Sequence, residues 1–426
     1  MNIQNNLEVI MKVAGLITEY NPFHLGHKYH LEKTKETAKA THTIAVMSSS
    51  FVQRGEPALV DKWTRAKMAV DNGVDLVLEL PFVFSVQTAE LFALGALKIL
   101  DAINVVDCIS FGSEIGEIEP LYKAAQILNE EPEEFKIILK NRLSLGMPYS
   151  ASRGYALQNY IEKMEKDSNL SYEALLKESN NILGIEYIKA LIKLKSNIVP
   201  HTIKRFGDKY NDQKIQSQIA SATGIRNILF ENQHEKAKSY MPEISYSYLM
   251  EFYEKYKMFN SIEEYRDIYQ YLFRTKSREE LKKLMDMENG LENRILEKGL
   301  KFYELERIIE EIRTKRYAAT RIKRILIHLL LDLKREEIEA LYALPTEHIR
   351  VLGLNKKGME ILNKIKTQTE LSIITKFSDY KNLLNENINK FMDFEEKATD
   401  IYYLAFNEDY PYKKMDYITT PYINFK

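Results

Sequence analysis

Between Lys12 and about Gly116 the sequence alternates short apolar runs with longer segments of amphipathic pattern. The apolar runs are VAGLITEY, THTIAVMSS, VDLVLELP and VVDCISFG, which are rich in residues that favour β-strands. The segments between them are HKYHLEKTKETAKA, DKWTRAKMAVDNG and VQTAELFALGALKILDAIN, and each is long enough to form a crossover helix. This alternation predicts a parallel sheet wrapped by helices, the arrangement of a Rossmann-like α/β domain.

The pattern changes along the rest of the chain. After Glu117 helical stretches replace the alternation, NIVPHTIKRFG predicts one more strand, and SQIASATGIRNILF predicts a loop that leads into a helix. From about Tyr240 onward the pattern is nearly all helical. We therefore expect an N-terminal extension over residues 1–10, a Rossmann-like domain over 11–240 with a helical insertion at about 118–178, and a mostly α-helical domain over 241–426.

Bulk properties limit the class of protein. With 426 residues and a formal net charge of −1, the composition is that of a soluble globular protein rather than a disordered or strongly polyanion-binding one. The single cysteine, Cys108, has no partner within the chain, which indicates a reducing compartment. No apolar run approaches the ~20 residues of a membrane span, and the first ten residues do not resemble a secretory signal. We expect a cytoplasmic protein that does not enter a membrane.

The stretch YNPFHLGHKYH, Tyr20 to His30, follows the first predicted strand and precedes a predicted helix. In parallel sheets ligands bind at the carboxyl ends of the strands, and a helix N-terminus favours phosphate oxygens. Here Gly26 would let a phosphate approach the backbone, while His24 and His27 can donate hydrogen bonds to its oxygens as negative charge develops. The alternatives are a metal-binding pair or ordinary capping and core histidines.

Several further positions are candidates for nucleotide contacts. Gly112 ends a predicted strand, where it either admits a base or ribose or is a plain turn glycine. Arg205 follows another strand and can reach a phosphate or pair with a carboxylate. Ser221 and Thr223 precede a helix start, where they cap the helix or hold phosphate oxygens, and Arg226 can neutralise a leaving pyrophosphate. The acidic residues follow no metal-ligand spacing, so no protein-built metal site is expected.

The segment RTKRYAATRIKR carries six basic side chains and no acidic one. Helical spacing over this segment predicts a basic stripe opposite an apolar face formed by Ile322, Ile325, Leu326 and Leu329. Such a helix is anchored in a core and presents cations to a nucleic-acid backbone, although a merely solvated basic face is the alternative. The candidate RNA-binding residues are Arg313, Arg316, Arg321, Lys323 and Arg324.

The H-x-G-H pattern behind a first strand resembles the HIGH signature of the nucleotidyltransferase superfamily. Together with GLITEYNPFHLGHKYHL, SNNILGIEYIKAL, IASATGIR, SSSFVQRGEPA, TKRYAATRIKRILIHLLL and RVLGLNKKG, it makes the chain similar to the bacterial tRNA(Met) cytidine acetate ligase family. The resemblance runs from about Met11 to near the carboxyl end. It implies an enzyme that activates acetate with ATP as acetyl adenylate, releases pyrophosphate, and acetylates the wobble cytidine of elongator tRNA(Met).

The resemblance also implies which residues act. His24 and His27 would be catalytic, and magnesium would be carried with the nucleotide. The loop SSSFVQRGEPALVDKWTRAK would close over acetate, with Arg54 on its carboxylate, or would be a solvated surface loop. No stable protein partner is implied. The ATP contacts would be Ile17, Thr18, Glu19, Tyr20, Asn21, Pro22, Phe23, His24, Leu25, Gly26, His27, Lys28, Tyr29, His30, Gly112, Asn180 or Asn181, Arg205 and Phe206, with Ser221, Thr223 and Arg226 from the residue-level argument above.

Three other functions compete with this one. A small-molecule adenylyltransferase with the same signature would be little more than the α/β domain, whereas this chain continues for nearly two hundred helical residues. A class I aminoacyl-tRNA synthetase would need a KMSKS-like loop, which the sequence lacks. A non-catalytic RNA-binding protein with a nucleotide pocket would bind ATP without releasing pyrophosphate.

Overall fold

A computed structural model of the chain describes residues 11–164, 170–205, 220–406 and 413–425. The predicted apolar runs form a parallel sheet with the strand order β5-β2-β1-β6-β7. These strands span β1 (Val13–Thr18), β2 (His42–Ser48), β5 (Leu76–Leu80), β6 (Cys108–Ser113) and β7 (Val199–Lys204). The Rossmann-like expectation is confirmed, and the carboxyl ends of β1, β2 and β6 meet at one edge.

Helices connect the parallel strands in the expected places. The crossovers are α1 (Leu25–Thr37), α2 (Lys62–Asp71), the short α3 (Phe82–Ser85) with α4 (Ala89–Ala102), and α9 (Ser179–Leu194). The side chain of Asp61 caps α2 by accepting the N–H of Thr64 at 2.7 Å. A two-stranded hairpin, β3 (Phe51–Val52) and β4 (Glu56–Pro57), leaves the sheet after β2 and reaches toward the edge described below.

The sheet continues with strands from the far end of the chain. β8 (His348–Asn355) pairs antiparallel with β5, and β10 (Tyr422–Asn424) and β9 (Ser372–Ile374) pair with β8. This differs from the expectation of a mostly α-helical domain after residue 240, which included no strand of the sheet. The first seven residues of β8 are buried, and a strand buried on both faces has no polar alternation that separates it from a helix.

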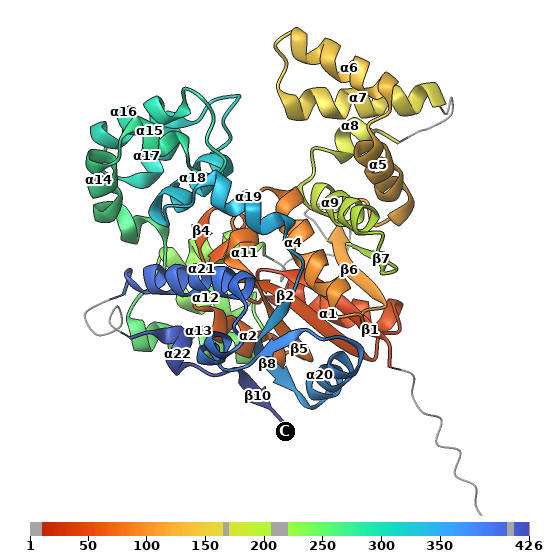
Figure 1. Cartoon of the computed structure of the whole chain (residues 1–426), viewed down its shortest axis with the longest axis vertical. Helices are drawn as coiled ribbons and strands as arrows, with labels where there is room; N and C mark the ends of the chain where they lie inside the picture. The colour runs from red at the N-terminus through yellow and green to blue at the C-terminus, as the bar shows by residue number, and fades with distance from the viewer. Residues whose placement is uncertain (1–10, 165–169, 206–219, 407–412, 426) are drawn as a thin grey trace, which may run out of the picture.

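Two groups of helices rise from the sheet on the same side of the molecule in Figure 1. The first contains α5 (Ile118–Glu130), α6 (Glu133–Ser144), α7 (Tyr149–Met164) and α8 (Tyr172–Leu175), between β6 and α9. The second contains η1 (Ile262–Tyr265), α14 (Arg266–Thr275), α15 (Arg278–Lys282), α16 (Leu291–Lys301), α17 (Leu305–Ile312), α18 (Ala319–Leu330) and α19 (Arg335–Ala343).

The remaining helices cover the sheet. They are α11 (Ala222–Phe230), α12 (His234–Lys238), α13 (Glu243–Tyr256), α20 (Lys356–Gln368), η2 (Phe377–Asn382), α21 (Glu386–Tyr403) and α22 (Met415–Ile418). One apolar core runs continuously from β1 through α13, α18 and α21, so the carboxyl-terminal half packs on the sheet rather than standing apart from it. In the described part of the chain, no helix combines the length and apolar character that a membrane crossing requires.

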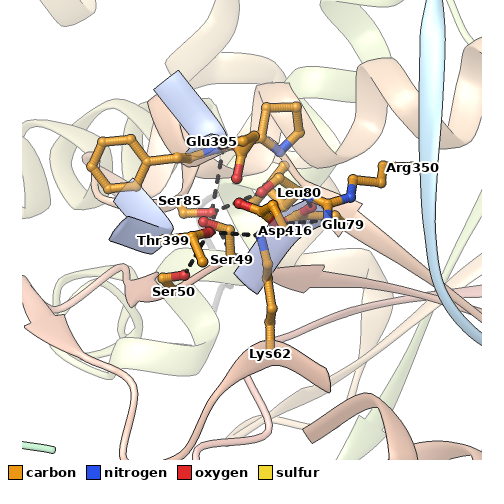
Figure 2. Close-up of polar contacts among 12 residues, drawn as sticks. Ser49, Ser50, Lys62, Glu79, Leu80, Ser85, Arg350, Glu395, Thr399 and Asp416 are labelled. Carbon is orange, nitrogen blue, oxygen red and sulfur yellow. Dashed lines mark hydrogen bonds and ion pairs between the residues drawn. The ribbon is translucent and has the colours of Figure 1, made fainter. Parts of the chain in front are cut away.

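A buried group of charges, here called the charge cluster, joins the two halves of the chain (Figure 2). Lys62 of α2 bonds Glu79 of β5 at 2.8 Å and Asp416 of α22 at 2.8 Å, while Arg350 of β8 contacts both carboxylates. Glu395 of α21 lies beside them and accepts the backbone N–H of Phe82. Two cations and three carboxyl groups are therefore removed from water together.

Candidate active site

The two histidines of the H-x-G-H stretch form the N-terminal cap of α1. Nδ1 of His24 accepts the N–H of Gly26 at 3.0 Å, and Nδ1 of His27 accepts the N–H of His24 at 3.2 Å. The two rings stack with centroids 3.7 Å apart. Capping uses only the Nδ1 atom of each ring and leaves Nε2 available to a ligand. The two histidines can therefore cap the helix and still serve the catalytic role expected from the sequence.

Burial and these contacts determine the protonation state and the tautomer of both imidazoles. Burial lowers the pKa of His24 to about 3, assisted by Arg205 and Arg226, and burial with the same Arg205 lowers the pKa of His27 well below its usual value. Both rings are neutral at pH 7, and because each Nδ1 accepts, each hydrogen lies on Nε2. The pair can thus present two neutral N–H donors to a ligand.

The backbone at the start of α1 is less open than the sequence suggests. The N–H of Leu25 donates to the carbonyl of Tyr240 at 3.0 Å, the N–H of Gly26 donates to His24, and the N–H of His27 donates to the carbonyl of His24 at 2.9 Å. In this state the first-turn donors are already bonded. A phosphate would meet imidazoles and arginines here before it met backbone N–H groups.

The rest of the segment from residue 17 to residue 30 builds the surroundings of these rings. Tyr20 and Phe23 are buried, with ring centroids 5.0 and 5.6 Å from that of His27. Asn21 is buried, its side-chain oxygen accepts the N–H of Leu59 at 2.7 Å, and it precedes Pro22 in a cis peptide. The half-buried members are Ile17, Thr18 and Glu19 at the end of β1 and Leu25, Lys28, Tyr29 and His30 on α1.

Arg226 is brought to the histidine pair from α11, as the sequence predicted for a residue one turn into a helix. Its guanidinium donates to the carbonyl of Asn21 at 3.0 Å and to Glu56 at 3.1 Å. Burial raises the pKa of Glu56, but Arg226 and Lys323 outweigh burial and the net shift is downward. Arg226 is thus a buried cation with one carboxylate partner, held at the carboxyl edge of β1.

The two asparagines at the start of α9, Asn180 and Asn181, make different contacts. Asn181 is buried, and its side-chain oxygen accepts the N–H groups of Glu114 at 2.9 Å and Ile115 at 3.2 Å. Asn180 is half-buried, and its side-chain oxygen accepts from Arg205 at 3.1 Å. The carboxylate of Glu114 in turn accepts the backbone N–H groups of both asparagines and so takes the place of an N-terminal cap.

Gly112 and Arg205 lie against each other at the ends of β6 and β7. A Cβ atom on Gly112 would lie 2.8 Å from Cγ of Arg205, so the missing side chain makes room for the arginine. The charge of Arg205 also helps burial to lower the pKa of His30 to about 4. A hollow of about 370 Å³ opens beside Arg205, lined by α1 and β7 residues that include Tyr29 and His201. Phe206 lies outside the described residues.

Ser221 and Thr223 serve α11 itself. The hydroxyl of Ser221 caps the helix by accepting the N–H of Gly224 at 3.1 Å, and the hydroxyl of Thr223 accepts from Arg226 at 3.3 Å. Both residues are exposed, so these bonds leave them accessible to a ligand. The ordinary capping alternative holds for Ser221.

The basic segment is only partly helical. α18 begins at Ala319, so residues 313–318 lie outside a helix, because Arg313 ends α17 and the chain turns before Ala318. The four apolar residues of the predicted face are buried as expected. All five candidate RNA contacts pair with acids, and the three on α18 are the less exposed ones: Arg321 pairs with Asp286 and Glu288, Arg324 with Asp286, and Lys323 with Glu56.

The other two basic candidates are exposed. The side chain of Arg313 is 57% exposed beside Glu310, and that of Arg316 is 69% exposed beside Glu288. Lys315 between them is exposed as well. The exposed cations therefore belong to the loop before α18 rather than to a stripe along it.

Sequence reasoning missed three groups that shape this site: Glu56, Glu114 and the carbonyl of Tyr240. Each comes from a segment distant in sequence from its partner, and no local pattern marks such contacts. Within the described ranges no three His, Cys, Asp or Glu side chains are grouped to hold a metal ion.

Comparison of the sequence with known proteins matches the chain to one family. The family model of the HIGH nucleotidyl transferases matches residues 11–416. A tRNA(Met) cytidine acetate ligase of Thermoanaerobacter sp. (strain X514) is 44% identical over 93% of this chain and 96% of its own. The enzyme of that name from Clostridium perfringens (strain ATCC 13124) is 41% identical over 97% and 100%.

A solved structure shares the whole fold. The crystal structure of Thermotoga maritima TmcAL bound with alpha-thio ATP superposes with a TM-score of 0.91 at 36% identity, covering 98% of this chain and 100% of the other. An apo form of the same Thermotoga protein gives the same values.

Proposed function

This chain belongs to the HIGH nucleotidyl transferase family and, within it, to the tRNA(Met) cytidine acetate ligases, and from that premise we propose the reaction that its site performs. The enzyme uses ATP to convert acetate to acetyl adenylate and then acetylates the exocyclic amine of the wobble cytidine of elongator tRNA(Met), giving N-acetylcytidine. Acetate is a poor electrophile and an aromatic amine a poor nucleophile, so the mixed anhydride makes the transfer feasible.

The observation that carries the proposal is the pair of neutral imidazoles at the start of α1, with Arg205 and Arg226 beside them. In the first step an acetate oxygen attacks the α-phosphorus, and the bond to the pyrophosphate oxygen breaks. The Nε2–H groups of His24 and His27 donate to oxygens on which charge accumulates, and Arg226 neutralises the departing pyrophosphate.

We assign the remaining nucleotide contacts by what each side chain has available. Asn180 is the better candidate of its pair because it is half-buried whereas Asn181 is buried. The side chain of Asn180 bonds Glu114 and Arg205, and that of Asn181 bonds the loop after β6. Arg205 and Gly112 flank the adenosine, with the residues from Ile17 to His30 beneath it. Ser221 and Thr223 are exposed hydroxyls near the triphosphate. Magnesium enters with the nucleotide, held by phosphate oxygens.

The tRNA is held by the carboxyl-terminal helical group. Its exposed cations Arg313, Lys315 and Arg316 precede α18, and α18 itself is tied to the activating site because Lys323 bonds Glu56 at 2.6 Å. Phosphate contacts from these cations supply affinity, while the base enters the site from a loop where unstacking is cheap. The reaction takes place in the cytoplasm, and the mechanism requires no protein partner.

Acetate-dependent cleavage of ATP tests the first step. Incubation with ATP and acetate should give AMP and pyrophosphate in the absence of RNA, and hydroxylamine should trap the activated acetyl group as acetohydroxamate. Formation of ADP and phosphate, or AMP release that does not depend on acetate, would exclude an acetyl adenylate intermediate. An adenylyltransferase would instead need a phosphorylated acceptor.

A further inference from the structure

Three carboxylates interact with the arginines beside the histidine pair, Glu19 and Glu56 with Arg226 and Glu114 with Arg205, and they differ in which of their oxygens are bonded. Glu56 gives one oxygen to Lys323 and the other to Arg226, and Glu114 gives both oxygens to the start of α9. Glu19 uses Oε1 to accept the N–H of Gln53 at 2.8 Å, and its Oε2 has no hydrogen-bond partner among the described residues. One carboxylate oxygen at this edge of the sheet is therefore available.

The backbone holds Glu19 in a fixed place. It follows the last residue of β1, and its carbonyl accepts from Arg65 at 2.8 Å. The fully buried Arg65 also binds the carbonyls of Ser48 and Ser49 at the end of β2. The residue is thus anchored between two strand ends at the edge where ligands of parallel sheets bind.

The histidines of the site cannot accept a proton from a substrate. In His24 and His27 the Nδ1 lone pair is used by a backbone N–H, and Nε2 carries the ring hydrogen. Their pKa values are also too low for an effective base at neutral pH. The transfer of an acetyl group to an amine must nevertheless release one proton, and the described side chains here offer the free oxygen of Glu19.

We infer that Glu19 is the general base of the transfer step, an inference that rests on the proposed function. The exocyclic nitrogen of the cytidine attacks the acetyl carbonyl carbon, and a C–N bond forms. The bond from that carbon to the phosphate oxygen breaks, and AMP leaves with the electron pair. The proton lost from nitrogen passes to Oε2 of Glu19 and then to water.

The charges around Glu19 suit this role. Burial raises the pKa of its carboxyl, and the negative charge of Glu56 raises it further. The hydrogen bond from the Gln53 N–H and the positive charges of Arg226 and Arg54 lower the pKa, but the net shift is upward. From the other packed elements, α2 presents Arg65 and α9 presents Tyr187. A carboxylate with a raised pKa is a stronger base than a free one.

The substitution Glu19→Gln separates a base from a structural group. The amide oxygen of glutamine can still accept the Gln53 N–H, but it cannot take a proton. Because Glu19 lies in the segment assigned to ATP, adenylate formation, followed by acetate-dependent ATP–pyrophosphate exchange, should fall by up to about tenfold, and the readout is the rate of transfer relative to exchange. Single-turnover transfer from supplied acetyl adenylate to tRNA(Met) should fall by about 10²- to 10⁴-fold. The matched control is Glu32→Gln, which removes an exposed carboxylate from α1 and should alter neither rate.

The pH profile gives an independent readout. In the wild type the transfer rate should fall as the pH drops through the pKa of Glu19, and in Glu19→Gln this limb should disappear. An equal loss of exchange and transfer would overturn the inference and make Glu19 part of ATP binding or folding. Unchanged transfer would overturn it as well. A wild-type protein that makes no acetyl adenylate would contradict the proposed function instead, and this outcome is visible before any variant is tested.

Discussion

Two imidazoles do at the start of α1 what a serine and a glutamate do in an ordinary capping box. The side chain of His24 accepts a backbone N–H of the first turn, and the side chain of His27 accepts the N–H of His24. The cap orients both rings and fixes their tautomer, so the structural role prepares the chemical one. Two donors are held in place before a nucleotide arrives, which lowers the cost of ordering them.

Substitutions that keep the cap but remove the imidazole test this double role. Asparagine at position 24 and glutamine at position 27 are good capping residues, so the free energy of unfolding should change by no more than about 1 kcal/mol. The rate of acetyl adenylate formation should fall by about a hundredfold or more in His24→Asn and in His27→Gln. Single-turnover rates near wild type in both variants would remove the histidines from the mechanism.

At the residue scale the sequence predicts the location of the proposed reactive groups better than it predicts their bonding partners. His24, His27 and Arg226 were placed by the order strand, turn and helix, which is a local pattern. Other contacts at the site join residues that are 66 to 267 positions apart in the sequence. They include the hydrogen bonds of the Asn181 side chain, the bond from the first turn of α1 to Tyr240, and the pairing of Lys323 with Glu56. Such contacts follow from the packing of the whole chain, which no short stretch encodes.

At the element scale the β3–β4 hairpin joins the activating site to the helical group. Glu56 of the hairpin bonds Arg226 of α11 and Lys323 of α18, and these bonds are 3.1 and 2.6 Å long. Gly55 at the hairpin turn has φ +78°, and a Cβ atom there would lie 2.3 Å from the backbone nitrogen of Arg324. The hairpin can approach α18 this closely because it has no side chain at that point.

Gly55→Ala should therefore destabilise the protein by about 3 kcal/mol, since it combines backbone strain with a clash against backbone atoms. The matched control is Gly146→Ala, which has φ +76° but no atom within 4 Å of the added Cβ. The control should cost about 1 kcal/mol from backbone strain alone. Denaturant unfolding measures both, and equal losses in the two variants would show that the hairpin is not packed tightly against α18.

Strands and helices whose apolar residues recur at a clear spacing were predicted, and those without such a spacing were not. The predicted strands β1, β2, β5 and β6 and their crossover helices have the expected bounds within a few residues. β8 was not expected because its residues, HIRVLGLN, are buried on both faces and lie between long helical segments. Residues 313–318 were expected to be helical because their basic spacing continues that of α18, yet α17 ends at Ile312 and α18 begins at Ala319.

At the scale of the whole molecule the charge cluster fastens the carboxyl-terminal elements to the sheet (Figure 2). Burial raises the pKa of Glu395 well above its usual value, and the neighbouring Glu79 adds to this effect. A protonated Glu395 leaves two positive and two negative charges, so the cluster is neutral. Lys62 and Arg350 each touch both Glu79 and Asp416.

Removal of one cation should be far more harmful than removal of the third acid. Lys62→Met leaves Glu79 and Asp416 to share Arg350, with one buried negative charge uncompensated, and should cost about 3–5 kcal/mol of unfolding free energy. Glu395→Gln imitates the protonated side chain, so it should match the wild type near pH 4 and be more stable than the wild type at pH 7, where unfolding lets Glu395 ionise.

The pH dependence gives the sign of the Glu395 contribution. The folded-state pKa lies above that of the unfolded chain, so the unfolded state loses this proton first and stability falls as the pH rises above about 4.5. Glu395→Gln should remove this decline. A variant that is strongly destabilised at pH 7, with an unchanged decline, would mean that Glu395 is ionised in the folded protein.

The division between activation and RNA binding predicts separable effects on affinity. Replacing Arg313, Lys315 and Arg316 by alanine should weaken tRNA binding and reduce its salt dependence by up to about one unit of slope for each lost phosphate contact. ATP affinity should not change. The control variant is Lys356→Ala with Lys366→Ala, which removes exposed cations from α20. Equal affinities and slopes in wild type and triple variant would show the loop to be merely solvated.

Acetylation of a single cytidine of tRNA(Met) is the central claim, and mass analysis of nucleosides tests it most directly. The protein is incubated with ATP, isotopically labelled acetate and an unmodified elongator tRNA(Met) transcript, and the RNA is then digested. Labelled N-acetylcytidine should appear in an amount that approaches one per tRNA, with AMP released in step, and a transcript with the wobble cytidine replaced by uridine should take up no label. ATP consumption without any labelled nucleoside, or label that is indifferent to the wobble position, would contradict the account.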